Sequence, residues 1–488
     1  MCNLKFHSQE GKRRSKKLLE FEMSASRNKI VPALLLGLSF VIGSGFSRGI
    51  RVQDVAPKVD EYMNAAVRAH HFSGTVLLAH DGHSIVSRGY GMANFELNVA
   101  NTPKTKFRIG SMTKQFTAMG VLILQERGKL SVADSICKYI PQCPQAWQEI
   151  TIQQLMTHTS GIHEYLRLSE FQQRALPLPV ASVIETLKTK PLDFKPGEKF
   201  SYSNSGYYIA GYIIEHASGK TYEAFLEENI FKPLGMSDTG YDDPNQLLPN
   251  RAAGYSLEAG GKIINAAYLD MSRPFAAGGL YSTAEDLLRW DAALYAERLV
   301  SRKSFEAALN SSVDASVKSL TGKYGYGWLT VQAAGRRAQV HAGEINGFTA
   351  FLARFPEEHA TVIVLSNFDN MPVETIAHDL AAILFGEKYE LPQARRAVQV
   401  DPRIYDLYAG QYALVLAPTV IFTIANEAGK LTAIVPGQPK IELTPSSETE
   451  FFVPGVNAQL RFTKDNNGQV TGLVLNQNGR ELKATKIK

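Results

Sequence analysis

The sequence predicts an α/β domain followed by a small all-β domain. Strand patterns lie at both ends of the first part of the chain with helical patterns between them, which indicates one sheet with helices on its faces and an inserted helical subdomain. A linker with prolines covers residues 391–403, and short β-rich runs separated by turn signals follow it, as in a small barrel or sandwich. We therefore expect a first domain at 48–390 and a second at 404–488, which holds no nucleophile, metal set or phosphate loop.

Residues 1–47 are predicted to be an N-terminal extension with a signal peptide. Eight Lys and Arg residues and three Glu residues in this stretch account for the whole net charge of +5, so the rest of the chain is formally neutral and gives no sign of nucleic-acid binding. Residues 30–47 are uncharged, largely apolar and end in small residues, the pattern of an export signal. We expect a periplasmic or secreted protein. The alternative is an uncleaved membrane anchor that associates the protein with the cell envelope.

Hydrophobic periodicity places the elements of the first domain. Helical spacing marks residues 54–71, and β-rich runs on either side of Asp81-Gly82 predict a hairpin over 72–91. Most of the next part is helix and loop, with helices expected at 151–156, 207–218, 222–230 and 284–295. After them we expect strands and a closing helix, at 327–331, 347–355, 360–366 and 372–384.

Apart from Cys2, the chain has two cysteines, Cys137 and Cys143, six positions apart. In an oxidising compartment they are expected to form a disulfide across the intervening turn; the alternative is two unrelated thiols. Their spacing and the lack of a nearby histidine argue against zinc. We expect neither a metal nor a cofactor.

Ser111 and Lys114 form a Ser-x-x-Lys motif at the start of a predicted helix that runs to Leu124. Residues three apart share a helix face, so the two side chains are expected to lie side by side. Free N–H groups of the first turn favour negative charge on the serine oxygen, and a buried neutral amine can accept the hydroxyl proton. Alone, the motif also fits a serine in a helix turn beside a surface lysine.

Tyr202 and Asn204 lie two apart in a loop of small polar residues, so in an extended loop both can point into one cleft. A tyrosine whose pKa is lowered by nearby cations can take and return protons, and an amide can hold a substrate carbonyl or the lysine. The alternative is a polar turn with a helix cap.

His341, Gly343 and Glu344 lie in a stretch of small residues beside a strand, where a substrate backbone can approach the strand edge. The backbone N–H groups of Glu344 and Ser111 would then form an oxyanion site. The alternative is a tight hairpin with an exposed histidine.

The three motifs follow one another in the order of a known family. The chain resembles the serine β-lactamase and penicillin-binding-protein superfamily, whose signature is Ser-x-x-Lys with Ser-Asp-Asn and Lys-Thr-Gly. Its Tyr-Ser-Asn element is similar to that of the class C β-lactamase-related branch, with its esterases and D-peptidases. Supporting stretches are at 155–162, 231–236 and 277–282. The resemblance covers about 55–385 and implies a β-lactamase/transpeptidase-like antiparallel sheet flanked by helices, while the tail is similar to a lipocalin-like barrel.

The resemblance also implies roles for the motif residues. Ser111 is the nucleophile, Lys114 its base and Tyr202 the proton shuttle, while Asn204 orients the substrate and the lysine. His341 stands where the family has the Lys of Lys-Thr-Gly. Because this histidine replaces a fixed cation, we expect a substrate without a carboxylate there; Glu344 is expected to repel anions and, if close, to raise the pKa of the histidine. His158, in a Thr-His-Thr setting, is interpreted as structural.

The expected activity is therefore that of an exported serine hydrolase that acts through an acyl-enzyme on a small ester, amide or lactam. One alternative is a D-aminopeptidase, DD-carboxypeptidase or true β-lactamase acting on peptidoglycan-like or β-lactam substrates. Another is a penicillin-binding sensor or scaffold that does not turn over. A third is an anchored envelope protein whose β-domain binds a partner or an apolar ligand. The expected partner is a small-molecule or peptide substrate.

Overall fold

The computed structural model describes residues 52–488 except 172–175, 259–261, 319, 394–396, 436–439, 454–457, 478–479 and 488. The predicted extension and signal peptide at 1–47 lie outside the described residues. Within the described part of the chain, no helix has the length and apolar character needed to span a membrane.

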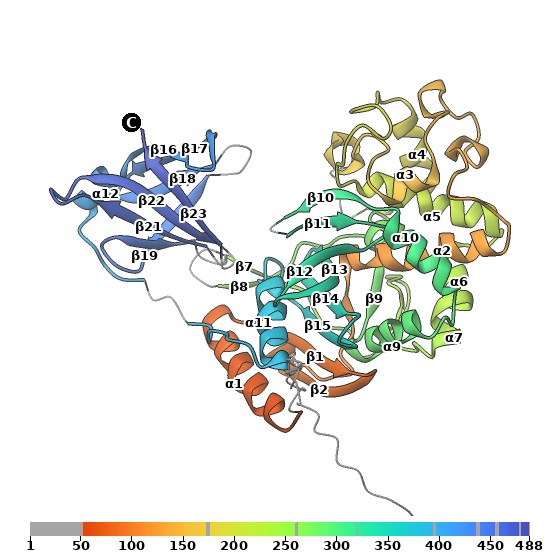
Figure 1. Cartoon of the computed structure of the whole chain (residues 1–488), viewed down its shortest axis with the longest axis horizontal. Coiled ribbons are helices and arrows are strands. Elements are labelled where there is room, and N and C mark those ends of the chain that lie inside the picture. The colour runs from red at the N-terminus through yellow and green to blue at the C-terminus, as the bar shows by residue number, and fades with distance from the viewer. Residues whose placement is uncertain are drawn as a thin grey trace, which may run out of the picture. The chain divides into compact units, whose positions relative to one another are not determined.

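An eight-stranded antiparallel sheet forms the centre of the first domain, with the order β10-β11-β12-β13-β14-β15-β1-β2 (Figure 1). The chain supplies β1 and β2 first and the other six strands last, which confirms the predicted sheet with strands from both ends of the domain. The strands are β1 (Gly74–His80), β2 (His83–Tyr90), β10 (Val313–Val317), β11 (Leu320–Tyr324), β12 (Leu329–Ala333), β13 (Arg336–Ile345), β14 (Phe348–Phe355) and β15 (Ala360–Ser366).

Helices cover both faces of this sheet, because its central strands are apolar on both sides. Every residue of β14 and β15 is buried. Alternate residues serve opposite faces: Val76 and Val364 pack toward α1 (Val52–His70) and α11 (Val373–Phe385). On the opposite face of the sheet, Leu77 and its neighbours pack in the core with α2 (Thr113–Glu126) and α9 (Ala284–Tyr295). The expected hairpin, strands and closing helix are therefore confirmed.

The helical subdomain lies between β2 and β10 in the chain. In the described ranges its remaining helices are α3 (Ile152–Met156), α4 (Val180–Lys188), α5 (Asn204–Ser218), α6 (Tyr222–Leu226), α7 (Lys232–Leu234), α8 (Phe275–Gly278) and α10 (Arg302–Asn310). Its short strands are β3 (Met92–Asn94), β4 (Val99–Ala100), β5 (Phe107–Arg108), β6 (Gly240–Tyr241), β7 (Tyr255–Leu257), β8 (Ile263–Asn265) and β9 (Leu280–Ser282). The helix α2 is buried along residues 113–124, since it runs between the sheet and the other helices.

One predicted helix boundary was wrong, and one hairpin was not predicted. Helix α5 begins at Asn204 instead of residue 207, because the Ser203 side chain caps it by accepting a hydrogen bond from the Gly206 N–H. The β10–β11 hairpin was not predicted, because this edge of the sheet is largely solvated and its strands carry polar side chains such as Asp314 and Lys323.

Residues 410–486 form a closed eight-stranded barrel, which decides between the barrel and the sandwich. Each strand pairs with the next in the chain, and the last pairs with the first. Aromatic side chains of Tyr408, Tyr412, Phe451 and Phe462 pack in its core. The strands are β16 (Gly410–Leu414), β17 (Ala417–Glu427), β18 (Lys430–Ile434), β19 (Ile441–Pro445), β20 (Glu450–Phe452), β21 (Ala458–Lys464), β22 (Val470–Gln477) and β23 (Arg480–Lys486), preceded by α12 (Tyr405–Tyr408).

A disulfide joins Cys137 and Cys143, whose Cα atoms are 5.3 Å apart, as expected from the sequence. It closes a short loop that packs against the core next to Ile136 and Ile140.

Replacing both cysteines, as Cys137→Ser with Cys143→Ser, should lower the free energy of unfolding by roughly 2 kcal/mol, because the unfolded chain loses a loop constraint. Urea unfolding followed by tryptophan fluorescence measures the effect on the first domain alone, since all three Trp residues lie within 147–328. A reductant should lower the stability of the wild type and leave the variant unchanged. Equal stability of the two oxidised proteins would contradict the prediction.

Candidate functional site

Ser111 lies in a short 3₁₀ turn, η1 (Gly110–Met112), that leads from β5 into α2. The sequence placed it in the first turn of the helix; the helix proper begins at Thr113. Gly110 has a φ of +49°, and a Cβ atom there would come 2.7 Å from the Glu344 backbone nitrogen. A glycine is therefore required for the Ser111 turn to lie against the main chain of β13.

Lys114 lies one helical turn after Ser111 and is 0% exposed. Its Nζ atom is 2.9 Å from Ser111 Oγ, from Asn204 Oδ1 and from the Ala277 carbonyl oxygen. Burial lowers the pKa of Lys114 from 10.5 to about 7, while the charge of Glu164 acts in the opposite direction. A substantial fraction of the amine is therefore uncharged near neutral pH.

The contacts of Lys114 determine where its lone pair points. A neutral amine has two N–H donors and one lone pair, whereas the ammonium ion has three donors. Two of the three partners, the Asn204 and Ala277 oxygens, are carbonyls that can only accept. When the amine is neutral, its two donors are used there, and its lone pair is left for the hydroxyl proton of Ser111.

Tyr202 lies beside this pair, with Lys114 Nζ 4.9 Å from the centroid of its ring. Burial raises the pKa of Tyr202 above 10.0, and a hydrogen bond with Ser111 offsets only part of that effect. The expectation that nearby cations lower this pKa was wrong, because burial dominates and the adjacent lysine is itself poorly charged. Tyr202 is a protonated phenol near neutral pH and can donate a proton.

Asn204 is the first residue of α5 and links Lys114 to a residue that the sequence did not indicate. Its Oδ1 accepts from Lys114, while its Nδ2 and backbone nitrogen donate to the Glu164 carboxylate at 3.3 and 2.6 Å. Glu164 belongs to no recognisable motif, since it lies 40 residues from Asn204 and becomes its neighbour only through folding.

The β13 strand extends beyond the end of its pairing with β12, and this extension lies beside Ser111. Pairing with β12 ends at Val340, so among the described residues the segment 341–345 pairs only with β14 and keeps a free edge. A Cβ atom on Gly343 would come 1.9 Å from the Ile109 oxygen, so the residue must be glycine for β13 to lie next to the serine turn.

His341 is buried rather than exposed. Its Nδ1 lies 2.6 Å from the Ala342 carbonyl oxygen, which can only accept, so the ring proton is on Nδ1. Its Nε2 then accepts from the Tyr324 hydroxyl at 3.0 Å. Burial, with the charge of Lys114, lowers the pKa of His341 to about 3, so this side chain is uncharged at neutral pH.

Glu344 does not act on His341 as expected. Its carboxylate forms an ion pair with Lys318, at the tip of the β10–β11 hairpin that the sequence did not predict. Glu344 is not among the causes of the His341 pKa shift, which is downward and arises mainly from burial. The repulsion expected of Glu344 toward anions is also countered, because a lysine lies against it.

His158 supports the tyrosine. Its Nδ1 accepts from the Ser203 N–H at 3.0 Å, and its ring lies 4.3 Å from that of Tyr202, centroid to centroid. The His158 side chain is buried, whereas Tyr202 is partly buried, and burial lowers the pKa of His158 below 6.5. The side chain packs as a neutral aromatic group, in agreement with its interpretation as structural.

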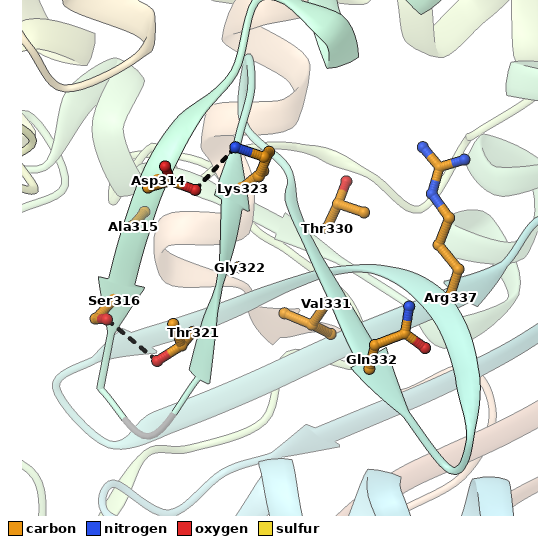
Figure 2. A pocket seen from close by; sticks show the side chains of 10 residues that line it. All are labelled: Asp314, Ala315, Ser316, Thr321, Gly322, Lys323, Thr330, Val331, Gln332 and Arg337. Atoms are coloured by element: carbon orange, nitrogen blue, oxygen red, sulfur yellow. Dashed lines mark hydrogen bonds and ion pairs between the residues drawn. The ribbon is translucent and has the colours of Figure 1, made fainter.

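Two other observations bear on alternative sites. Among the described residues, no group of His, Cys, Asp and Glu side chains could hold a metal ion. An open cavity of about 570 Å³ lies over β10, β11 and β12, where Asp314 and Lys323 form a 2.8 Å ion pair (Figure 2). None of the predicted site residues lines it, so it is separate from the Ser111 site.

The chain shows clear similarity to known proteins. A family model described as Beta-lactamase matches residues 57–386. Penicillin-binding protein 4* of Bacillus subtilis is 30% identical over 445 residues, which cover 86% of this chain and 96% of that protein.

Solved structures of related proteins show the same similarity. An octameric penicillin-binding protein homologue from Pyrococcus abyssi has a TM-score of 0.62 and 26% identity, with 88% of this chain and 99% of the other covered. A D-amino acid amidase from Ochrobactrum anthropi shares the fold at 24% identity and a TM-score of 0.58, over 64% of this chain and 92% of the other. With Ser111, Lys114, Tyr202 and Asn204 gathered in one site, the chain belongs to the β-lactamase and penicillin-binding-protein family, whose members are generally serine hydrolases.

Proposed function

We propose that the protein is a serine hydrolase that acts through an acyl-enzyme on a small ester or amide. The observation that carries this proposal is the buried amine of Lys114, which lies 2.9 Å from Ser111 Oγ and has a pKa of about 7. A base with a pKa near the working pH combines a large deprotonated fraction with a useful driving force for proton transfer.

The first half-reaction follows from this geometry. Lys114 takes the hydroxyl proton while Ser111 Oγ forms a bond to the substrate carbonyl carbon, whose oxygen becomes an oxyanion. The backbone N–H groups of Ser111 and Glu344 are the proposed donors to that oxyanion, since the two main chains lie together at Gly110. Tyr202 donates its proton to the leaving alcohol or amine as the carbonyl–heteroatom bond breaks, and recovers one from the Lys114 ammonium.

The second half-reaction reverses these proton movements. Water loses a proton to Lys114, which is again the neutral amine, as the water oxygen adds to the acyl carbon. The Ser111 oxygen leaves with a proton, and a carboxylic acid is released. Asn204 and the free edge of β13 are the proposed contacts for the rest of the substrate.

The rate should rise with pH through about 7, because the active form of Lys114 is the neutral amine and its pKa is lowered to that value. Since the pKa of His341 is about 3, its titration falls below the range measured. The measurement is kcat/KM for a neutral ester between pH 5 and 9. A profile that is flat across pH 6–8 would mean that Lys114 is not the base.

Tyr202→Phe and Lys114→Ala should each lower turnover by on the order of 10²–10⁴, since each removes a proton-transfer group. Tyr212→Phe is a matched control, because that hydroxyl lies on the outer side of α5 and contacts His216. Circular dichroism and urea unfolding establish that the variants are folded. Near-normal turnover in Tyr202→Phe would remove the tyrosine from the mechanism.

Acylation tests whether Ser111 is the nucleophile, and turnover after acylation separates a hydrolase from a penicillin-binding module. Intact-mass analysis after treatment with penicillin or a fluorophosphonate should show one adduct on the wild type and none on Ser111→Ala. With a chromogenic ester, steady turnover is expected after any burst. A single stoichiometric burst without turnover would instead support the sensor or scaffold, and an adduct that persists in Ser111→Ala would refute the proposed nucleophile.

The proposed substrate lacks a carboxylate at the position that faces β13. His341 supplies no charge there, and the loss of a charged hydrogen bond costs about 1.5–3 kcal/mol of binding. The Lys318–Glu344 pair adds little net charge, since both side chains are about half exposed and screened by solvent. We therefore infer an esterase or peptidase with weak β-lactamase activity.

His341→Lys should raise the ratio of kcat/KM for a cephalosporin to that for a neutral ester at pH 7, because it introduces a cation. His341→Gln is the matched control: it is neutral, can accept from Tyr324, and should leave the ratio near the wild-type value. A wild type that already prefers the cephalosporin would make this protein a β-lactamase, and a ratio that falls in His341→Lys would contradict the electrostatic argument.

We also propose that the protein is exported. The apolar segment at 30–47 and the Cys137–Cys143 disulfide support this, because disulfides persist in oxidising compartments.

We propose two domains, at 48–390 and 404–488, joined by a linker at 391–403. The family match, which ends at residue 386, and the barrel, which begins at Gly410, support these limits.

A further inference from the structure

Glu164 lies behind the catalytic groups and, among the described residues, is linked to them by its hydrogen bonds with Asn204. Its Oε2 accepts from the Asn204 backbone nitrogen at 2.6 Å and from that of Ser205 at 3.5 Å. Its Oε1 accepts from Asn204 Nδ2 at 3.3 Å and from the Leu166 nitrogen at 3.4 Å. All four contacts come from N–H groups, as expected for a carboxylate, which can only accept.

The carboxylate determines which way the Asn204 amide points. An amide side chain has a donor end and an acceptor end, and the two can exchange by rotation about the terminal bond. One end of Asn204 faces Glu164 and the other faces Lys114. Because Glu164 can only accept, the Nδ2 end must face it, and the Oδ1 end is left for Lys114 Nζ at 2.9 Å.

That orientation matters to the base. If the amide were reversed, its NH₂ group would face the Lys114 amine, and one of the two acceptors that hold the N–H groups of the neutral amine would be lost. The lone pair would then no longer be directed at Ser111. On the basis of the proposed function, we propose that Glu164 is a positioning residue that keeps the oxygen of Asn204 toward Lys114 and thereby aims the general base at the nucleophile.

The groups around Lys114 come from several elements. Asn204 and Tyr207 lie on α5, and the loop before this helix supplies Tyr202. His341 lies on β13, and the charge of Lys114 contributes to lowering the pKa of this histidine and that of His158. Among the described residues, Glu164 is the carboxylate whose charge affects the pKa of Lys114. It raises this pKa, against the larger lowering effect of burial.

A simpler role for Glu164 is helix capping, because it accepts from the first backbone nitrogens of α5. Glu164→Gln separates the two roles. The amide oxygen of Gln can still accept from the Asn204 backbone nitrogen, so the cap is retained. Its NH₂ group, however, then faces Asn204 Nδ2, and the two donors conflict unless the Asn204 amide rotates away from its bond to Lys114.

The reciprocal exchange restores the pattern. In the double variant Glu164→Gln with Asn204→Asp, the Gln NH₂ group donates to one oxygen of the new carboxylate at position 204, and the other oxygen of that carboxylate accepts from Lys114. Asn204→Asp alone places two carboxylates against each other, so it is expected to be impaired as well. Helix capping offers no reason for the second substitution to rescue the first.

The experiment measures kcat/KM for a neutral ester between pH 5 and 9.5 in the full-length wild type, both single variants and the double variant. Glu164→Gln should lower the high-pH plateau of kcat/KM by on the order of 10- to 100-fold. It should also move the rise of kcat/KM with pH to lower pH, because a charge that raises the pKa of Lys114 is gone. The double variant should have a plateau of kcat/KM at least about tenfold higher than that of Glu164→Gln. Its rise of kcat/KM should lie at higher pH than in the wild type, because the carboxylate at position 204 contacts Lys114.

Glu215→Gln is the matched control, since Glu215 also accepts from a helix-start nitrogen, that of Tyr222, without reaching the site; its activity should be unchanged. The positioning role would be overturned if Glu164→Gln had the same pH profile of kcat/KM as the wild type. It would also be overturned if kcat/KM of the double variant were no higher than that of the less active single variant. A change in KM alone, with the pH profile unmoved, would also overturn it and point to direct substrate contact. If the wild type shows no Ser111-dependent turnover, the proposed function fails instead.

Discussion

The burial of one amine is the constraint on which the rest of the site depends. Lys114 can act as a base near neutral pH only because it is removed from water, and an uncompensated buried cation would be costly. The fold reduces that cost by giving the amine two carbonyl acceptors and the hydroxyl of Ser111. The helix that carries it is buried along residues 113–124, since it runs through the core between the sheet and the helical subdomain.

Close backbone packing brings the remaining groups to that amine. Gly110 and Gly343 allow the serine turn and the edge strand to approach at distances that a Cβ atom would prevent. The β13 strand also runs beyond the last residue of β12 that pairs with it, so a strand edge lies open beside Ser111. The close contact between η1 and β13 and the open strand edge therefore lie at the same end of β13.

The electrostatics of the site are weaker than its motifs imply. Tyr202 is kept protonated, His341 is kept neutral, and Lys114 is only partly charged near neutral pH, in each case mainly because of burial. Charge is found at the border, in the Glu344–Lys318 pair and in Glu164. Such a site can move protons among neutral groups, and it offers little fixed charge to an anionic substrate.

The sequence by itself determined the class of fold, the order of the helix-flanked sheet and the all-β barrel, and the principal motif residues, because hydrophobic periodicity and short motif spacing are local properties. Only the tertiary structure decided which partners those residues meet. Glu164 and Tyr324 belong to no motif, and the Lys318 contact depends on a hairpin that polar edge strands concealed. The pKa of Tyr202 was expected to fall and is raised, since burial is a sum over neighbours that are distant in the chain and cannot be read from adjacent residues.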